Sequence, residues 1–119
     1  MISTLTFDEK RIRELLFKTW SLETSTRWTA ENPACGQCSV TALVIHKLFG
    51  GLLLKTRVDG AWHFYNKIGN QIFDLTDSQF PCPVVYEHIP AKREEAFQDT
   101  SVIQYQMLKQ KLNDLNTGN

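Results

Sequence analysis

The fold depends on one stretch of the chain, Asn32-Pro33-Ala34-Cys35-Gly36-Gln37-Cys38-Ser39-Val40-Thr41-Ala42-Leu43-Val44-Ile45-His46-Lys47-Leu48-Phe49-Gly50-Gly51. Pro33 and Gly36 interrupt regular structure before Cys38, and the Gly50-Gly51 pair ends the segment that begins there. Between these breaks, apolar residues are spaced to cover most of a helix surface. The stretch therefore predicts a helix buried inside the fold, with its apolar positions at Val40, Leu43, Val44, Ile45, Leu48 and Phe49.

Cys38 falls in the first turn of this predicted helix. Backbone N–H groups there have no partner within the helix, and the positive end of the helix dipole favours an anion. A thiol in this position tends toward the thiolate, which is the nucleophilic form of cysteine. We therefore interpret Cys38 as the nucleophile of a cysteine enzyme, and weigh this against the common case of a cysteine that is only a small buried hydrophobic residue.

The length and composition indicate a neutral protein of modest size. We expect residues 1–119 to form one domain, because 119 residues with a hydrophobic fraction of 42% suffice for a single core. The formal net charge is zero, which gives no electrostatic reason to bind nucleic acid or an anionic membrane. No apolar run approaches membrane-spanning length, so we expect neither nucleic acid nor a membrane as a partner.

The N-terminus and the cysteines predict where the protein works. The first ten residues lack a basic start followed by an apolar run, so we expect no signal peptide. Three cysteines, an odd number, fit a reducing compartment better than a disulfide framework. We therefore expect a cytoplasmic protein, a monomer or a weak homodimer, and leave open its export by a dedicated secretion system.

After the buried helix the pattern changes from helical to alternating. Asp59-Gly60 and Gly69-Asn70 are turn signals that separate runs rich in β-branched and aromatic residues. A small antiparallel sheet is therefore expected, with strands at 52–58, 62–68 and 71–76 and a short edge strand or loop at 84–90.

Helices are expected before and after this region. Residues 7–20 have amphipathic spacing with Asp8 as the cap, and residues 91–115 end the domain with helix. The predicted architecture is α+β, with a central Cys38 helix packed on the antiparallel sheet and a C-terminal helix. That last helix carries an apolar stripe at Val102, Tyr105, Leu108, Leu112 and Leu115.

A weak nucleophile needs a base, and the base needs an orienting group. His63 lies on the second predicted strand and Asp74 on the third. A two-residue loop at Ile68-Gly69 or at Gly69-Asn70 puts both side chains on one face, directly opposed or diagonal. A three-residue loop would separate them unless a bulge restored the face. The hairpin therefore predicts a His63–Asp74 pair, which Cys38 completes if its helix packs on the sheet.

These residues define an expected mechanism. Cys38 attacks an acyl carbon, His63 takes the proton and later donates it to the leaving group, and Asp74 fixes the tautomer of His63. Such a site makes and breaks amides, thioesters or esters. We expect it to act on a protein, a peptide or a small acyl or amide compound, with no cofactor and no metal.

The sequence also offers groups to hold the substrate. The oxyanion would meet the backbone N–H of Cys38 and a side-chain amide from Gln37 or Asn32. Trp62, which directly precedes His63, is expected to contribute to substrate binding.

A set of short motifs runs through most of residues 32–80. They are Asn32-Pro33, Gly36-Gln37-Cys38-Ser39-Val40-Thr41-Ala42-Leu43, Phe49-Gly50-Gly51, Leu54-Lys55-Thr56, Trp62-His63-Phe64-Tyr65-Asn66 and Asp74-Leu75-Thr76. Together they resemble a small bacterial family labelled YunG-like. This resemblance implies a fold and a site but no substrate.

The order of the three candidate residues resembles a broader group as well. A cysteine at a helix start, a histidine on a strand and an aspartate on the next strand are similar to the papain-like and transglutaminase-like superfamily. This resemblance implies a Cys-His-Asp triad of Cys38, His63 and Asp74 on a papain-like core. Two positions depart from the papain pattern: the oxyanion glutamine falls at Asn32, and the aromatic residue after the cysteine is replaced by Ser39.

The cysteines have two alternative interpretations. Cys35-Gly36-Gln37-Cys38 is a C-x-x-C motif at a helix start, as in thioredoxin-type redox pairs, and Cys35 would also allow reversible protection of Cys38 as a disulfide. No strand is expected to lead into the motif, which favours acyl chemistry over redox chemistry. A zinc site is the weaker alternative, with the ligand set Cys35, Cys38, Cys82 and His88.

The third alternative is a protein without catalysis. A binding or interaction module on the same scaffold would use its aromatic residues for packing or as a partner surface. These residues are Trp62, Phe64, Tyr65 and Phe73.

Overall fold

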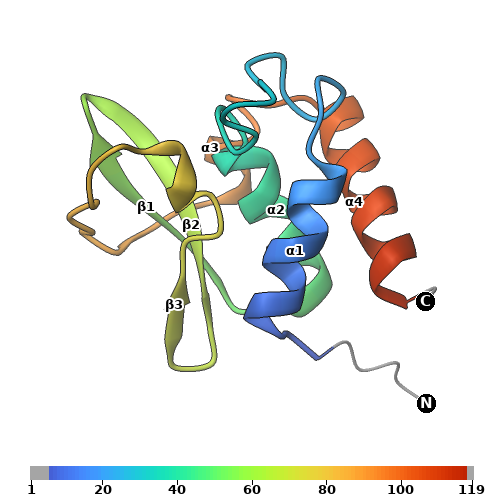
Figure 1. Cartoon of the computed structure of the whole chain (residues 1–119). Helices are drawn as coiled ribbons and strands as arrows, with labels where there is room; N and C mark the ends of the chain where they lie inside the picture. The colour runs from blue at the N-terminus through green and yellow to red at the C-terminus, as the bar shows by residue number, and fades with distance from the viewer. Residues whose placement is uncertain (1–5, 118–119) are drawn as a thin grey trace.

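The helix at the centre of the molecule is α2 (Cys38–Phe49) in the computed structural model, which describes residues 6–117. Figure 1 shows α2 between the sheet on one side and α4 (Val102–Thr117) on the other. Every residue from Ser39 to Ile45 is buried, and Leu43, Val44 and Ile45 are 0% exposed. The prediction of a buried helix is confirmed, because apolar side chains on all sides of α2 meet either the sheet or another helix.

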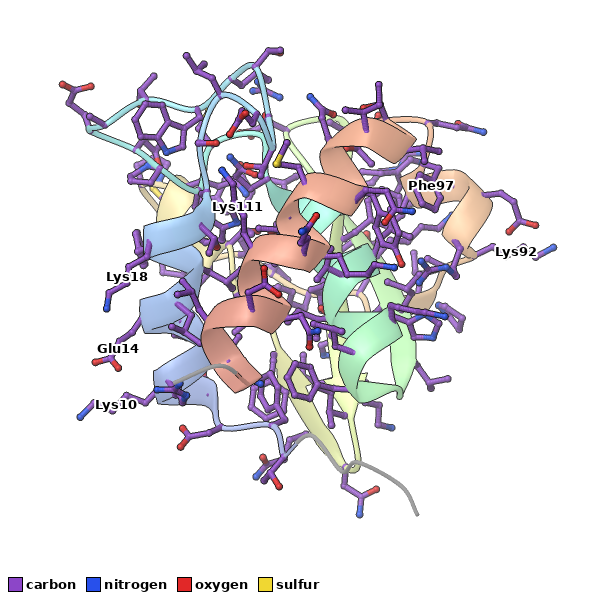
Figure 2. All side chains as sticks on the ribbon, turned by 90° about the vertical axis from the view of Figure 1, so that its right-hand side faces the viewer. Lys10, Glu14, Lys18, Lys92, Phe97 and Lys111 are labelled. Carbon is purple, nitrogen blue, oxygen red and sulfur yellow. The ribbon has the colours of Figure 1, made fainter. Side chains whose placement is uncertain are left out.

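The first helix, α1 (Glu9–Thr19), packs against α4 and closes the far side of the core. It begins where predicted, at Asp8, whose side chain accepts a hydrogen bond from the backbone N–H of Arg11 at 3.3 Å. A cap of this kind stabilises a helix by about 1 kcal/mol. Figure 2 shows the polar face of α1, with Lys10, Glu14 and Lys18 directed away from the core.

Within residues 6–117, the strands form one antiparallel sheet in the order β3-β2-β1-β4. β1 (Leu52–Val58) and β2 (Ala61–Ile68) pair along their whole length across the predicted Asp59-Gly60 turn. β3 (Gln71–Phe73) pairs only with the C-terminal part of β2, and β4 (Ile89–Pro90) pairs with the middle of β1.

Two strands are shorter than the alternating pattern predicts. β3 ends at Phe73 rather than at Thr76, because the Asp74 side chain accepts a hydrogen bond from the Thr76 backbone N–H at 3.3 Å and turns the chain. β4 keeps only the end of the expected 84–90 segment, since His88 has a φ of 55° and Pro90 has no N–H to donate.

The C-terminal region, where helix was expected over 91–115, forms two separate helices. α3 (Arg93–Ala96) stops after one turn, and α4 begins at Val102. The apolar stripe of α4 is buried only in its middle, at Tyr105, Leu108 and Leu112. Val102 and Leu115 are 62% and 41% exposed, because the two ends of α4 extend beyond the core.

The two faces of the sheet have different neighbours. Phe64 and Asn66 of β2 face α2, and the Asn66 side chain donates a hydrogen bond to a backbone carbonyl of that helix at 3.0 Å. His63 and Tyr65 alternate with them and face the opposite side. Residues 80–88, here called the covering segment, lie over that second face, where their rings contact those of His63 and Tyr65. In Figure 1 this segment crosses on the side of the sheet away from the helices.

Gly51 allows α2 to lead directly into β1. Its φ is +81°, and a Cβ at this position would lie 2.1 Å from the carbonyl oxygen of Lys67 on β2. The neighbouring Gly50 also has a positive φ, +78°, but a Cβ there would meet nothing within 4 Å. A side chain at Gly50 would therefore meet backbone strain alone, whereas a side chain at Gly51 would meet both strain and the backbone of β2.

We expect Gly51→Ala to destabilise the fold more than Gly50→Ala does. Both substitutions force a residue with a Cβ into a left-handed backbone region, but the first one also pushes β1 off β2. The expected difference is about 1–3 kcal/mol in the free energy of unfolding, measured by urea denaturation of both variants. Equal losses in the two variants would show that strain alone decides the cost.

Candidate active site

Cys38 is the first residue of α2, as the sequence predicts. Gln37 is the N-cap residue and its side chain makes no capping hydrogen bond. The backbone N–H groups of the first turn therefore receive no hydrogen bond from the side chain of the N-cap residue. The helix dipole also places partial positive charge beside the Cys38 sulfur. This environment favours a thiolate.

His63 and Asp74 form the pair that the hairpin predicts. The β2–β3 register pairs Ile68 with Gln71, so the loop is Gly69-Asn70 and the two side chains lie diagonally on one face. The Nε2 atom of His63 is 2.7 Å from Oδ2 of Asp74. Both side chains are nearly excluded from water, at 3% and 5% exposed. The hydrogen bond is therefore short, charge-assisted and shielded from solvent.

The position of Cys38 depends on where β3 ends. β3 pairs with β2 only from Asn66 onward, so the preceding residues of β2 form a free edge on that side. The Cys38 sulfur interacts at this edge with the backbone N–H of Phe64 and with the His63 side chain. Because Nε2 of His63 is taken by Asp74, Nδ1 is the ring nitrogen left to exchange a proton with Cys38.

The electrostatics favour an ion pair between Cys38 and His63. Burial raises the pKa of the Cys38 thiol, but the neighbouring His63 side chain and the Phe64 N–H outweigh burial and lower it. Burial lowers the pKa of His63, but the hydrogen bond with Asp74 and the neighbouring Cys38 thiol outweigh burial and raise it to about 9. Both shifts favour a thiolate next to an imidazolium over a neutral thiol and imidazole.

Asp74 is held on both carboxylate oxygens. Oδ1 accepts from the backbone N–H and the hydroxyl of Thr76 at 3.3 and 3.4 Å. Oδ2 accepts from His63 and also from the Tyr86 hydroxyl, which lies 2.6 Å away. Tyr86 is a site residue that the sequence did not single out, because nothing in its local pattern links it to Asp74.

A cavity of about 670 Å³ opens in front of Cys38 and His63. Trp62 forms part of its wall, as expected for a substrate-binding residue, with the Lys55 and Arg57 side chains 4.3 and 4.4 Å from the ring centre. Other walls come from residues 25–27, from Gln79-Phe80 and from the ends of α3 and α4. Sequence reasoning missed these walls, because they come from loops with no motif of their own.

Gly36 brings the 25–27 loop to the cavity. Its φ is +74°, and a Cβ here would lie 2.6 Å from the Ser25 hydroxyl and 2.7 Å from the Arg27 Cβ. The glycine two positions before Cys38 is therefore required by close packing of the loop on the start of α2.

Comparison with known proteins places the chain in a family. The model of the family described as YunG protein matches residues 8–116. The chain belongs to the YunG family. One relative, described as "Uncharacterized protein YunG" from Bacillus subtilis (strain 168), is 52% identical over 101 residues, which cover 85% of this chain and 88% of the relative. No solved structure matches the chain.

In this YunG family member the two expected oxyanion amides lie outside the cavity lining. Gln37 is 0% exposed, and its Oε1 accepts a hydrogen bond from the Thr24 hydroxyl at 2.9 Å. The Asn32 amide donates to the backbone carbonyl of Gln79 at 3.2 Å. Of the three expected oxyanion donors, the backbone N–H of Cys38 is the one whose residue lines the cavity.

The other cysteines are placed away from the pair. Cys35 is half-buried in the turn before α2 and does not line the cavity, and no strand leads into that turn. Cys82 is exposed in the covering segment, and His88 is bonded through Nδ1 to the Tyr65 hydroxyl at 3.0 Å. Within residues 6–117, no group of His, Cys, Asp and Glu side chains could hold a metal ion, so the zinc alternative is wrong for this part of the chain. None of the helices described there is long and apolar enough to cross a membrane.

We expect His63 to remain protonated at neutral pH and to lose its proton as the pH rises through about 9. Because the hydrogen bond with Asp74 is the largest of the causes that raise this pKa, Asp74→Asn should move the titration to lower pH. The measurement is a pH titration of 15N-histidine-labelled protein by NMR. His46 is an internal reference, since burial and the nearby Arg93 lower its pKa. A titration of His63 below that of His46 in the wild type would contradict this assignment.

Proposed function

We propose that this YunG family member is a cysteine-dependent hydrolase or acyl transferase that uses Cys38, His63 and Asp74. The observation that carries the proposal is the buried His63–Asp74 hydrogen bond of 2.7 Å on the strand next to the Cys38 sulfur. A structural cysteine needs no imidazole held in place by a carboxylate. A nucleophilic cysteine needs both.

The reaction begins with the Cys38 thiolate attacking an acyl carbon, which forms a C–S bond and a tetrahedral oxyanion. The oxyanion meets the backbone N–H of Cys38 at the start of α2. His63 donates its Nδ1 proton to the leaving group as the bond to the acyl carbon breaks. Water or an acceptor amine then gives a proton back to His63 and takes the acyl group, which restores the thiolate and the imidazolium.

We assign the scaffold to the papain-like and transglutaminase-like superfamily. Support comes from the arrangement of the parts: the nucleophile begins a buried helix, the helix packs on an antiparallel sheet, the histidine lies on β2, and the aspartate directly follows the neighbouring strand β3. In this proposal residues 1–119 form one catalytic domain.

The cavity limits the substrate class. Its volume of about 670 Å³ admits a side chain or a short peptide end rather than a large folded surface. We therefore propose an amide, thioester or ester carried by a protein side chain, a peptide end or a small acyl compound, in the cytoplasm and without a cofactor. The Trp62 ring forms the apolar wall against which such a group packs.

The first test is the rate of Cys38 alkylation by iodoacetamide as a function of pH, in a background that carries Cys35→Ser and Cys82→Ser. We expect a reactive thiolate well below the ordinary thiol pKa of about 8.5. His63→Ala should lower the rate at pH 6 by about tenfold or more, because the imidazolium partner is lost. His46→Ala, on the same helix as Cys38, is the matched control and should leave the profile unchanged. An ordinary thiol titration that ignores His63 would favour a non-catalytic binding module.

The second test asks whether an acyl group is transferred and released. With p-nitrophenyl acetate we expect a burst of p-nitrophenol, a mass gain of one acetyl group on Cys38, and continued turnover. Cys38→Ala should abolish all three, and His63→Ala should slow turnover by about 10²- to 10⁴-fold. Turnover that persists in Cys38→Ala would place the nucleophile elsewhere. A single acylation without turnover would argue for a reactive cysteine without catalysis.

A further inference from the structure

The covering segment is fastened to the second face of the sheet through polar groups. The Glu87 backbone N–H donates to the Thr56 hydroxyl at 2.9 Å, and the His88 backbone N–H donates to the Tyr65 hydroxyl at 2.8 Å. Between these two anchors, Tyr86 stacks with His88 and packs edge-on against Tyr65. The Tyr86 side chain is thus held over the sheet by its neighbours and aimed at the buried pair.

The Tyr86 hydroxyl and the His63 ring bind the same carboxylate oxygen of Asp74. Its oxygen is 2.6 Å from Oδ2 of Asp74, and Nε2 of His63 is 2.7 Å from the same atom. Among the described residues, the opposite oxygen, Oδ1, accepts only the longer Thr76 contacts of 3.3 and 3.4 Å. The shortest hydrogen bond that restrains the rotation of the carboxylate is therefore the one from Tyr86.

We propose that Tyr86 is a positioning residue of the site, which fixes the Asp74 carboxylate so that His63 keeps Nε2 on Asp74 and Nδ1 free for Cys38. This inference rests on the proposed function and extends it from three residues to four. The covering segment then supports the site directly, because it delivers the hydroxyl through packing that the rest of the chain already provides.

The lone pairs of Oδ2 link the Tyr86 hydroxyl to the orientation of His63. A carboxylate oxygen accepts hydrogen bonds from two directions, and Tyr86 occupies one of them. With that direction filled, the remaining one points at His63. Without the hydroxyl, the carboxylate is restrained only by His63 and by the long Thr76 bonds, so it can turn and weaken its hold on the imidazolium.

Other ionisable groups near the His63–Asp74 pair have partners of their own. Arg13 of α1 donates to the backbone carbonyl of Asp74 at 3.1 Å and to the Asp77 carboxylate at 3.1 Å. It therefore pairs with the side chain of Asp77 and not with that of Asp74. Cys38 faces His63 from α2, and the Tyr65 ring stacks beside it at 6.1 Å. Glu87 and His88 are bonded to β1 and β2. The described residues thus place no cation on Oδ2 that would replace Tyr86.

The test compares Tyr86→Phe with Tyr105→Phe in the background with Cys35→Ser and Cys82→Ser. Both variants lose the hydroxyl of a tyrosine that packs on other aromatic rings, but only the first one loses a bond to Asp74. We expect Tyr86→Phe to raise the pH midpoint of Cys38 alkylation by iodoacetamide and to lower the rate at pH 6 by about 3- to 10-fold, since hydrogen bonds to charged groups are among the stronger ones. Tyr105→Phe, in α4, should keep the wild-type midpoint.

A second comparison separates positioning from general loosening of the fold. If Tyr86 acts through Asp74, Tyr86→Phe should change nothing further in a chain that already carries Asp74→Asn. A midpoint for Tyr86→Phe that equals that of Tyr105→Phe, or that moves down, overturns the inference, as does an undiminished effect in the Asp74→Asn chain. The proposed function would fail differently, through a wild-type profile that His63→Ala leaves unchanged.

Discussion

The hydrogen bond between His63 and Asp74 is the constraint on which the other features of the site depend. An ionised carboxylate excluded from water is costly unless donors meet it on both oxygens. Here a strand, a turn and the covering segment each supply a donor. The same bonds that satisfy the charge also end β3, close the second face of the sheet and fix the orientation of the imidazole. Fold and chemistry therefore share one set of contacts.

The early end of β3 has a second consequence. Asp74 turns the chain after Phe73, so the part of β2 that precedes Asn66 keeps a free edge. A longer β3 would pair with Phe64 and occupy the place of the Cys38 sulfur. In the proposed mechanism, the residue that orients the base thus also clears the position of the nucleophile. This link explains why a short strand and a backbone N–H that no strand pairs belong to the proposed site.

The parts of the site that local sequence rules determine were predictable. Gly36 and the Gly50-Gly51 pair bound the Cys38 helix, and the even-numbered loop at Gly69-Asn70 requires His63 and Asp74 to share a face. Tyr86 was not predictable, because its contact with Asp74 depends on the path of a proline-containing loop across the sheet. The cavity walls escaped prediction for the same reason.

The net charge of the proposed site explains why Asp74 needs no cation besides His63 and is bound by the neutral donors Thr76 and Tyr86. A thiolate, an imidazolium and a carboxylate sum to one negative charge. In the proposed reaction that charge moves from sulfur to the substrate oxygen, while the imidazolium and the carboxylate stay as they are. Sulfur and oxyanion would both lie at the start of α2, where the helix dipole is fixed before the reaction begins. The proposed reaction therefore needs no cation to enter or leave. The geometry of His63 is the feature that it must preserve, and the bonds of Thr76 and Tyr86 to Asp74 provide it.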